Sequence, residues 1–142
     1  MLVTVNDRTV IRRLCYKPIW PTAPRDFLCC ITWTELEDGS LLICSRVVPN
    51  KFLKVQDDYV RGFVDITGYW IQPCHTLEKH DPLYDPANTS SSCKVTLVVH
   101  TDLGGTLPTW IVNVLITEAP VKVLSKISVI FQEESIKTLV SN

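Results

Sequence analysis

The spacing of apolar residues changes once along the chain, and this change limits the folds open to it. Up to about residue 101, short runs alternate apolar and polar residues, as strands with one buried face do. After Gly104 and Gly105, apolar residues recur at intervals of three and four, as on an amphipathic helix. Because no helical pattern separates the strand runs, we expect an antiparallel sheet followed by one long helix, which is the α+β class.

Turn signals divide the first part of the chain into strands. Asp38-Gly39 is a strong hairpin signal, because glycine tolerates positive φ. A second turn is expected near Thr67-Gly68. The strands are expected at residues 2–5, 9–16, 26–34, 41–48, 59–66, 68–73 and 93–101.

The last part of the chain predicts a helix from Pro108 to about residue 137. Proline suits the first turn of a helix, where its missing N–H costs nothing. Pro120 falls inside the pattern and should kink the helix without ending it. One stripe carries the apolar residues Val112, Ile116, Ala119, Val123, Ile127 and Phe131.

Length and composition exclude several classes of protein. The chain has 142 residues, of which 46% are hydrophobic and 20% charged, so it is expected to form a single folded domain over residues 1–142. The net charge of −1 argues against a nucleic-acid partner. The longest stretch without charge, 103–117, contains two glycines and a proline and is too short to span a bilayer.

The residues that could carry chemistry form no known catalytic or metal-binding pattern. The six cysteines lie mostly in apolar runs and no export signal is visible, which predicts reduced thiols and a cytoplasmic location. Cys74, His75, His80 and Cys93 do not have the spacing of a common zinc finger. No Gly-x-Ser-x-Gly elbow is present. We therefore expect no metal, no cofactor and no enzymatic activity.

A set of short motifs gives the sequence a resemblance to a known family. In chain order they are Arg25-Asp26-Phe27, Leu36-Glu37-Asp38-Gly39-Ser40, Val60-Arg61-Gly62, Gly68-Tyr69, Lys94-Val95-Thr96, and Thr101-Asp102-Leu103-Gly104-Gly105 with Leu107-Pro108. Over about residues 9–131 the sequence resembles a StAR-related lipid transfer (START) domain. The resemblance implies a helix-grip fold, in which a curved antiparallel sheet wraps around a long C-terminal helix and encloses a lipid tunnel. It also implies that the N-terminal part of the family's domain is missing here.

The resemblance implies a non-catalytic function. START domains bind one sterol, phospholipid or ceramide molecule, and some carry it between membranes, so we expect a lipid ligand and transient contact with a membrane surface. The alternative is a protein-interaction or regulatory domain of a larger multidomain protein, which would cover its apolar face with a protein partner and carry no lipid. An enzyme with a similar fold would need a catalytic constellation that this sequence lacks.

The same resemblance indicates which residues line the tunnel. It places the helix stripe against the lipid and Leu103 near the tunnel mouth, while it gives Arg25, Asp26, Arg61 and Asp102 a structural role. Alternation puts Phe27, Cys29, Ile31 and Trp33 on one face of the strand 26–34. We expect this face to point inward, because its side chains are bulkier and more apolar than those of the other face. The candidate lipid contacts are Phe27, Cys29, Ile31, Trp33, Val98, His100, Leu103, Ile116, Ala119, Val123, Ile127 and Phe131. For His100, packing or capping is the alternative role.

Arg12 is the one charged candidate. Sterol-binding relatives hold an acidic and a basic side chain in the tunnel, and by position these correspond to Arg12 and Ile31 here. An arginine in an apolar tunnel needs an anion such as a phosphate, which favours a phospholipid or another acidic lipid. The alternative is that Arg12 faces solvent, because adjacent Arg12 and Arg13 must point to opposite faces of a strand.

Overall fold

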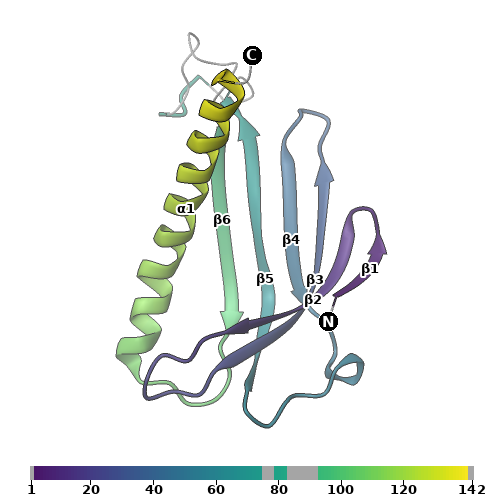
Figure 1. The fold of residues 1–142 in the computed structure, drawn as a ribbon, viewed down its shortest axis with the longest axis vertical. Helices are drawn as coiled ribbons and strands as arrows, with labels where there is room; N and C mark the ends of the chain where they lie inside the picture. The colour runs from purple at the N-terminus through teal and green to yellow at the C-terminus, as the bar shows by residue number, and fades with distance from the viewer. Residues whose placement is uncertain (1, 75–78, 83–92, 141–142) are drawn as a thin grey trace. The chain divides into compact units, whose positions relative to one another are not determined.

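A computed structural model of the chain describes residues 2–74, 79–82 and 93–140 (Figure 1). The chain divides into two compact units, Met1–Gly105 and Thr106–Asn142, and each is described by itself. The first unit contains the sheet and the second contains the helix. This order of elements confirms the predicted α+β class.

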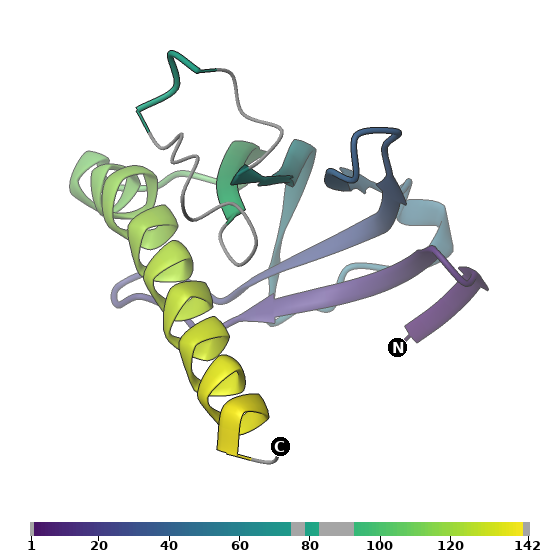
Figure 2. The same ribbon diagram turned by 90° about the horizontal axis from the view of Figure 1, so that it is seen from above.

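The sheet has six strands that follow one another in space as they do along the chain. Neighbouring strands are antiparallel, and Figure 2 shows that the sheet is strongly curved. The start of the fifth strand also pairs in parallel with the start of the third, where the shorter fourth strand has ended. The strands are β1 (Leu2–Asn6), β2 (Thr9–Tyr16), β3 (Arg25–Glu35), β4 (Leu41–Val47), β5 (Val60–Pro73) and β6 (Cys93–Asp102).

The predicted turn at Thr67-Gly68 is wrong. β5 is one strand of 14 residues, and Gly68 lies within it, opposite Cys44 on β4 and Val98 on β6. A Cβ atom on Gly68 would lie 2.2 Å from the carbonyl oxygen of Ile43. Glycine is therefore required here because two backbones approach closely, and not because the chain reverses.

The strand register assigns the side chains to two faces of the sheet, because residues paired across neighbouring strands point to the same side. We call the face that carries Cys29 the apolar face. It contains Val10, Arg12 and Leu14 of β2, Phe27, Cys29, Ile31 and Trp33 of β3, Ile43 and Ser45 of β4, Val64, Thr67, Tyr69 and Ile71 of β5, and Val95, Leu97 and Val99 of β6. Its buried centre is Phe27, Cys29 and Val64.

The second unit is the helix α1 (Thr109–Val140). The N–H groups of Ile111 and Val112 donate to the carbonyl oxygen of Pro108, so the helix begins directly after the proline, one residue later than predicted. The helix continues on both sides of Pro120. Glu118 and Lys122 form an i,i+4 ion pair of 2.7 Å on its surface.

Candidate functional site

The apolar face brings together side chains of one chemical kind from five strands of the first unit. Aliphatic and aromatic side chains from β2 to β6 make up most of it. Trp33 is 41% exposed and Val99 is 52% exposed, so the face extends from the buried core to solvent-accessible apolar surface. Such a surface can remove a water-insoluble molecule from water, and the free energy gained is proportional to the apolar area covered.

A few polar groups interrupt this apolar surface. Ser45 lies on β4 between Ile31 and Thr67 of the neighbouring strands, and the hydroxyl oxygens of Thr67 and Thr101 are 3.3 Å apart. Cys29 is completely buried beside them, and burial raises the pKa of its thiol. A thiol held in the protonated form is a poor nucleophile, so Cys29 acts in packing.

Arg12 lies on the apolar face, directly opposite Cys29 in the register of β2 and β3. The residue is exposed, and within the described part of the chain it has no hydrogen bond or ion pair. Its neighbour Arg13 points to the other face, where it bonds to Asp26. Of the two adjacent arginines, the one on the apolar face is therefore the one without a partner among the described residues, which makes it a candidate for binding an anion.

The candidate residues on β6 do not share this face. Val98 pairs with Gly68 and His100 pairs with Ile66, which puts both on the side opposite Cys29. His100 Nδ1 lies 3.1 Å from a carboxylate oxygen of Asp65, and both side chains are largely exposed. Alternation alone could not reveal this, because the side taken by β6 depends on its register through β4 and β5.

The β6 residues that do share the apolar face are Val95, Leu97 and Val99, none of which was a candidate from the sequence. They follow Tyr69 and Ile71 of β5 across the sheet. Leu103, just beyond the end of β6, packs against the buried centre of the face. Its carbonyl oxygen accepts a hydrogen bond of 3.4 Å from Arg25 Nε.

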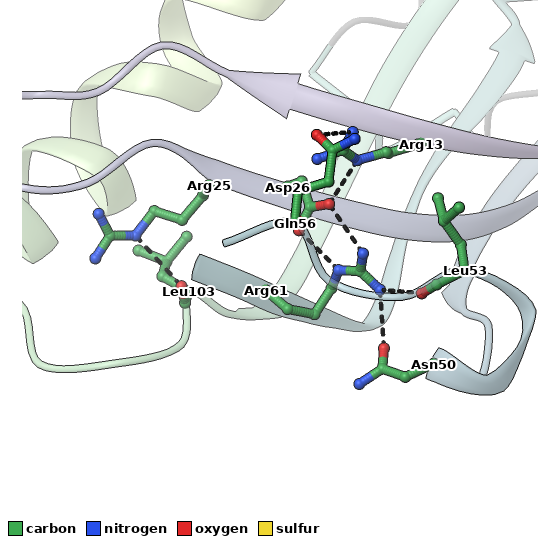
Figure 3. A network of polar contacts seen from close by, with 8 residues as sticks. All are labelled: Arg13, Arg25, Asp26, Asn50, Leu53, Gln56, Arg61 and Leu103. Carbon is green, nitrogen blue, oxygen red and sulfur yellow. Dashed lines mark hydrogen bonds and ion pairs between the residues drawn. The ribbon is translucent and has the colours of Figure 1, made fainter. Parts of the chain in front are cut away.

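An ionic cluster is buried on the opposite face, at the start of β3 (Figure 3). Both oxygens of Asp26 accept hydrogen bonds from Arg61, at 2.7 and 2.9 Å, and one also accepts from Arg13 Nε at 2.6 Å. Arg61 also bonds to Asn50 at 2.9 Å, and Arg13 to Gln56 at 2.7 Å. We call these five residues the Asp26 cluster. It fastens the connection between β4 and β5, including the short 3₁₀ helix Asn50–Phe52, to the strands.

In the Asp26 cluster two guanidinium groups, of Arg13 and Arg61, share one carboxylate. Asp26 is completely buried and the Arg61 side chain is 4% exposed. The hydrogen bonds from Arg61 hold the pKa of Asp26 below its usual value, with a further contribution from Arg13, even though burial opposes this shift. The expected structural roles of Asp26 and Arg61 agree with these contacts.

The helix stripe of the second unit contains Ile116, Ala119, Val123, Ile127 and Phe131. At about 100° per residue, these side chains fall within an arc of about 120° on one side of α1. Ile116 is 66% exposed and Phe131 is 54% exposed. The stripe is therefore a second apolar surface with accessible side chains.

Neither a metal site nor a membrane-spanning segment was expected from the sequence. Among the described side chains, those of residues 3–74, 79–82 and 93–131, no group of three or more His, Cys, Asp and Glu could hold a metal ion. His75, one of the candidate ligands, lies outside the described residues. No helix in the described part of the chain is long and apolar enough to cross a membrane.

Taken together, a curved antiparallel sheet followed by one long C-terminal helix defines the helix-grip class of α+β proteins. The family model of the START domain matches residues 2–135, so the chain belongs to the START domain family. No curated protein matches the chain.

Solved structures agree with this assignment. Human StAR-related lipid transfer protein 5 is 23% identical, with a TM-score of 0.60 over 82% of this chain and 50% of that protein. The lipid transfer and protein localization domain of human StarD13 is 26% identical, with a TM-score of 0.56 over 75% of this chain and 47% of that domain. A STAR-related lipid transfer protein of Xanthomonas axonopodis is 19% identical, with a TM-score of 0.65 over 93% of this chain and 66% of that protein. The chain thus spans about half the length of the human structures.

Proposed function

We propose that the chain binds a single lipid molecule of the phospholipid or sterol class, without catalysing a reaction on it, and exchanges it during transient contact with membranes in the cytoplasm. The observation that carries the proposal is the apolar face of a START-family sheet, which reaches from the buried centre at Cys29 to exposed Trp33 and Val99. The related structures named as lipid transfer proteins support the same class of ligand. In this proposal the two units act together as one lipid-binding domain over residues 1–142.

The proposed lipid contacts in the sheet are Phe27, Cys29, Ile31 and Trp33, with Leu103 at the edge of their packed centre. Val98 and His100 point from the other face, so on β6 we propose Val95, Leu97 and Val99 in their place. On α1 the proposed contacts are Ile116, Ala119, Val123, Ile127 and Phe131. Burial of apolar lipid surface contributes about 25 cal/mol per Å², which makes the acyl or ring portion the main source of affinity.

The direct test is native mass spectrometry of the purified chain after incubation with mixed liposomes, followed by extraction and identification of the bound lipid. We expect a complex with one lipid for each 16.1 kDa chain. A folded chain that stays at its bare mass in every lipid mixture would contradict the proposal. That result would favour the protein-interaction domain, whose apolar face is covered by a protein partner.

The helix stripe provides the first prediction. Val123→Asp or Ile127→Asp is expected to reduce lipid uptake from liposomes at least about tenfold, since a carboxylate is strongly disfavoured in an apolar contact. Ser125→Asp is the matched control, because it adds the same charge to an exposed position on the other side of the helix. Uptake by extraction of a fluorescent phospholipid should therefore fall for the two stripe variants only. Equal uptake by all three would remove α1 from the proposed site.

Arg12 provides the second prediction, which concerns the head group. Arg12→Gln is expected to weaken binding of an anionic phospholipid about ten- to a hundredfold and to leave cholesterol binding nearly unchanged, because a charge-assisted hydrogen bond to the phosphate is lost. Arg46→Gln, which removes an exposed arginine from the opposite face, is the control. Binding would be measured by competition in liposomes of phosphatidylserine or cholesterol. A parallel loss for both lipids would mean that Arg12 does not contact the head group.

A further inference from the structure

A band of polar side chains crosses the apolar face, and the lipid-binding proposal leaves its three hydroxyl groups without a role. The band begins on β2 and ends on β6, with one member on each of the five strands. Its members are Arg12, Cys29, Ser45, Thr67 and Thr101. Thr101 belongs to this face because it pairs with Val64, which lies in the buried centre together with Cys29.

Each member of the band is a neighbour of the next. Arg12 lies opposite Cys29, and Ser45 lies opposite Thr67, in the register of the sheet. Burial raises the pKa of the Cys29 thiol and the interaction with Ser45 partly offsets this rise, so these two side chains are also close together. The hydroxyl oxygens of Thr67 and Thr101 are 3.3 Å apart. The band is therefore continuous from β2 to β6.

The hydroxyl groups of the band have hydrogen-bonding capacity that the described residues do not use. Thr67 and Thr101 share one hydrogen bond, so one of the two keeps a hydrogen that no described residue accepts. Ser45, Thr67 and Thr101 are all half-buried, so each keeps some accessible surface. A molecule that covers the face would remove water from these hydroxyls, which costs free energy unless the molecule supplies hydrogen-bond acceptors.

The length of the band distinguishes between classes of lipid. Arg12 on β2 and Ser45 on β4 are two strand spacings apart, which is about 10 Å along the sheet. A sterol has one hydroxyl group and can occupy only one end of such a band. A phospholipid has an anionic phosphate and, a few bonds away, the carbonyl oxygens of its ester-linked acyl chains. These oxygens accept hydrogen bonds and carry no hydrogen, so they match the free donors of the hydroxyl groups.

We propose that Ser45, Thr67 and Thr101 bind the acyl carbonyl oxygens of a phospholipid whose phosphate lies at Arg12. This inference rests on the proposed function and narrows its ligand to lipids with acyl linkages. The acyl chains then cover the accessible apolar side chains beyond the band, such as Trp33. The three hydroxyl groups determine specificity, because they hydrogen bond to an ester-linked lipid and are left unpaired by a lipid without carbonyl groups.

The test compares phosphatidylserine that has two ester-linked chains with its diether analogue, in which a methylene group replaces each carbonyl group. The wild-type chain is expected to bind the diester roughly three- to tenfold more tightly in competition for uptake from liposomes. The double variant Thr67→Val, Thr101→Val keeps the branched side chains and removes both hydroxyl groups, so it should lose most of this preference. Thr9→Val, Thr32→Val is the matched control, because it removes another pair of neighbouring threonine hydroxyls on the opposite face.

Two further measurements separate this inference from misfolding and from the other proposals. The Thr67, Thr101 double variant should bind the diether analogue at least as well as the wild type does, which a misfolded chain could not do. Arg12→Gln should weaken binding of both lipids and keep the preference for the diester. Equal binding of the two lipids by the wild type, or an unchanged preference in the double variant, would overturn the inference and leave lipid binding itself intact. A folded chain that binds neither lipid would overturn the proposed function and this inference together.

Discussion

Asp26→Asn is expected to lower the free energy of unfolding by about 3–5 kcal/mol, because it breaks a buried ion pair and leaves Arg61 with no anion beside it. The Arg61 side chain is 4% exposed and Arg13 is 13% exposed, so water cannot replace the lost carboxylate. Asparagine keeps the size of the side chain but offers one acceptor oxygen to two guanidinium groups. The connection between β4 and β5, which the cluster fastens, should loosen first.

The measurement is urea unfolding at pH 7 followed by circular dichroism. Asp65→Asn is the control, because it removes a carboxylate whose ion pair with His100 is exposed on both sides. Its expected effect is under about 1 kcal/mol. Similar losses for the two variants would mean that the Asp26 cluster contributes no more than a surface ion pair.

The pH dependence gives the same cluster an independent readout. The folded state lowers the pKa of Asp26, so the ionised cluster stabilises the protein fully above the ordinary aspartate value of about 3.9. This contribution is lost as the pH falls from that value through the lower pKa of the folded state. As the pH falls through this range, the free energy of unfolding should therefore decrease more steeply for the wild type than for Asp26→Asn. The difference in stability between the two proteins should become smaller.

Much of the fold could be predicted because it depends on local patterns. Alternation located the strands, although it divided β5 in two, and the hairpin signal at Asp38-Gly39 agrees with a φ of 79° at Gly39 between β3 and β4. The switch to helical spacing after Gly105 agrees with the start of α1 at Thr109. These features are encoded within a few residues, so they do not require knowledge of strand pairing.

The features that the sequence did not predict all depend on pairing between distant segments. The direction of Val98 and His100 follows from the register of β6 on β5, which includes an irregularity between Val64 and Ile66. The choice of Arg13 over Arg12 for the ionic cluster follows from the pairing of β2 with β3. The alternation of apolar and polar residues cannot predict either feature. It divides the residues of a strand between two faces, but it does not say which face is covered by the rest of the protein.

Gly68 is the clearest example of this limit, and it leads to the second large effect. Gly68→Ala is expected to lower the free energy of unfolding by about 3 kcal/mol, because the new methyl group would lie 2.2 Å from the Ile43 carbonyl oxygen. The contact is with backbone, so no side-chain rotation can relieve it. β4 and β5 would have to separate in the middle of the sheet, where Gly68 lies between Cys44 and Val98.

Gly39 is the matched control, since it is required for a different reason. It has a φ of 79°, and nothing lies within 4 Å of an added Cβ atom. Gly39→Ala should cost about 1–2 kcal/mol through backbone strain alone. Asparagine tolerates the left-handed region better than alanine does, so Gly39→Asn should be milder than Gly39→Ala.

At Gly68 the order of the two substitutions should reverse. Asparagine is larger than alanine and relieves no strain there, so Gly68→Asn should be at least as destabilising as Gly68→Ala. Urea midpoints for the four variants separate the two reasons for a glycine. If Gly68→Asn were instead the milder substitution, as in a turn, residues 67–68 would reverse the chain and the continuous strand β5 would be disproved. If asparagine is the worse substitution, Gly68 is required for the close contact between β4 and β5 that allows β5 to cross the whole sheet.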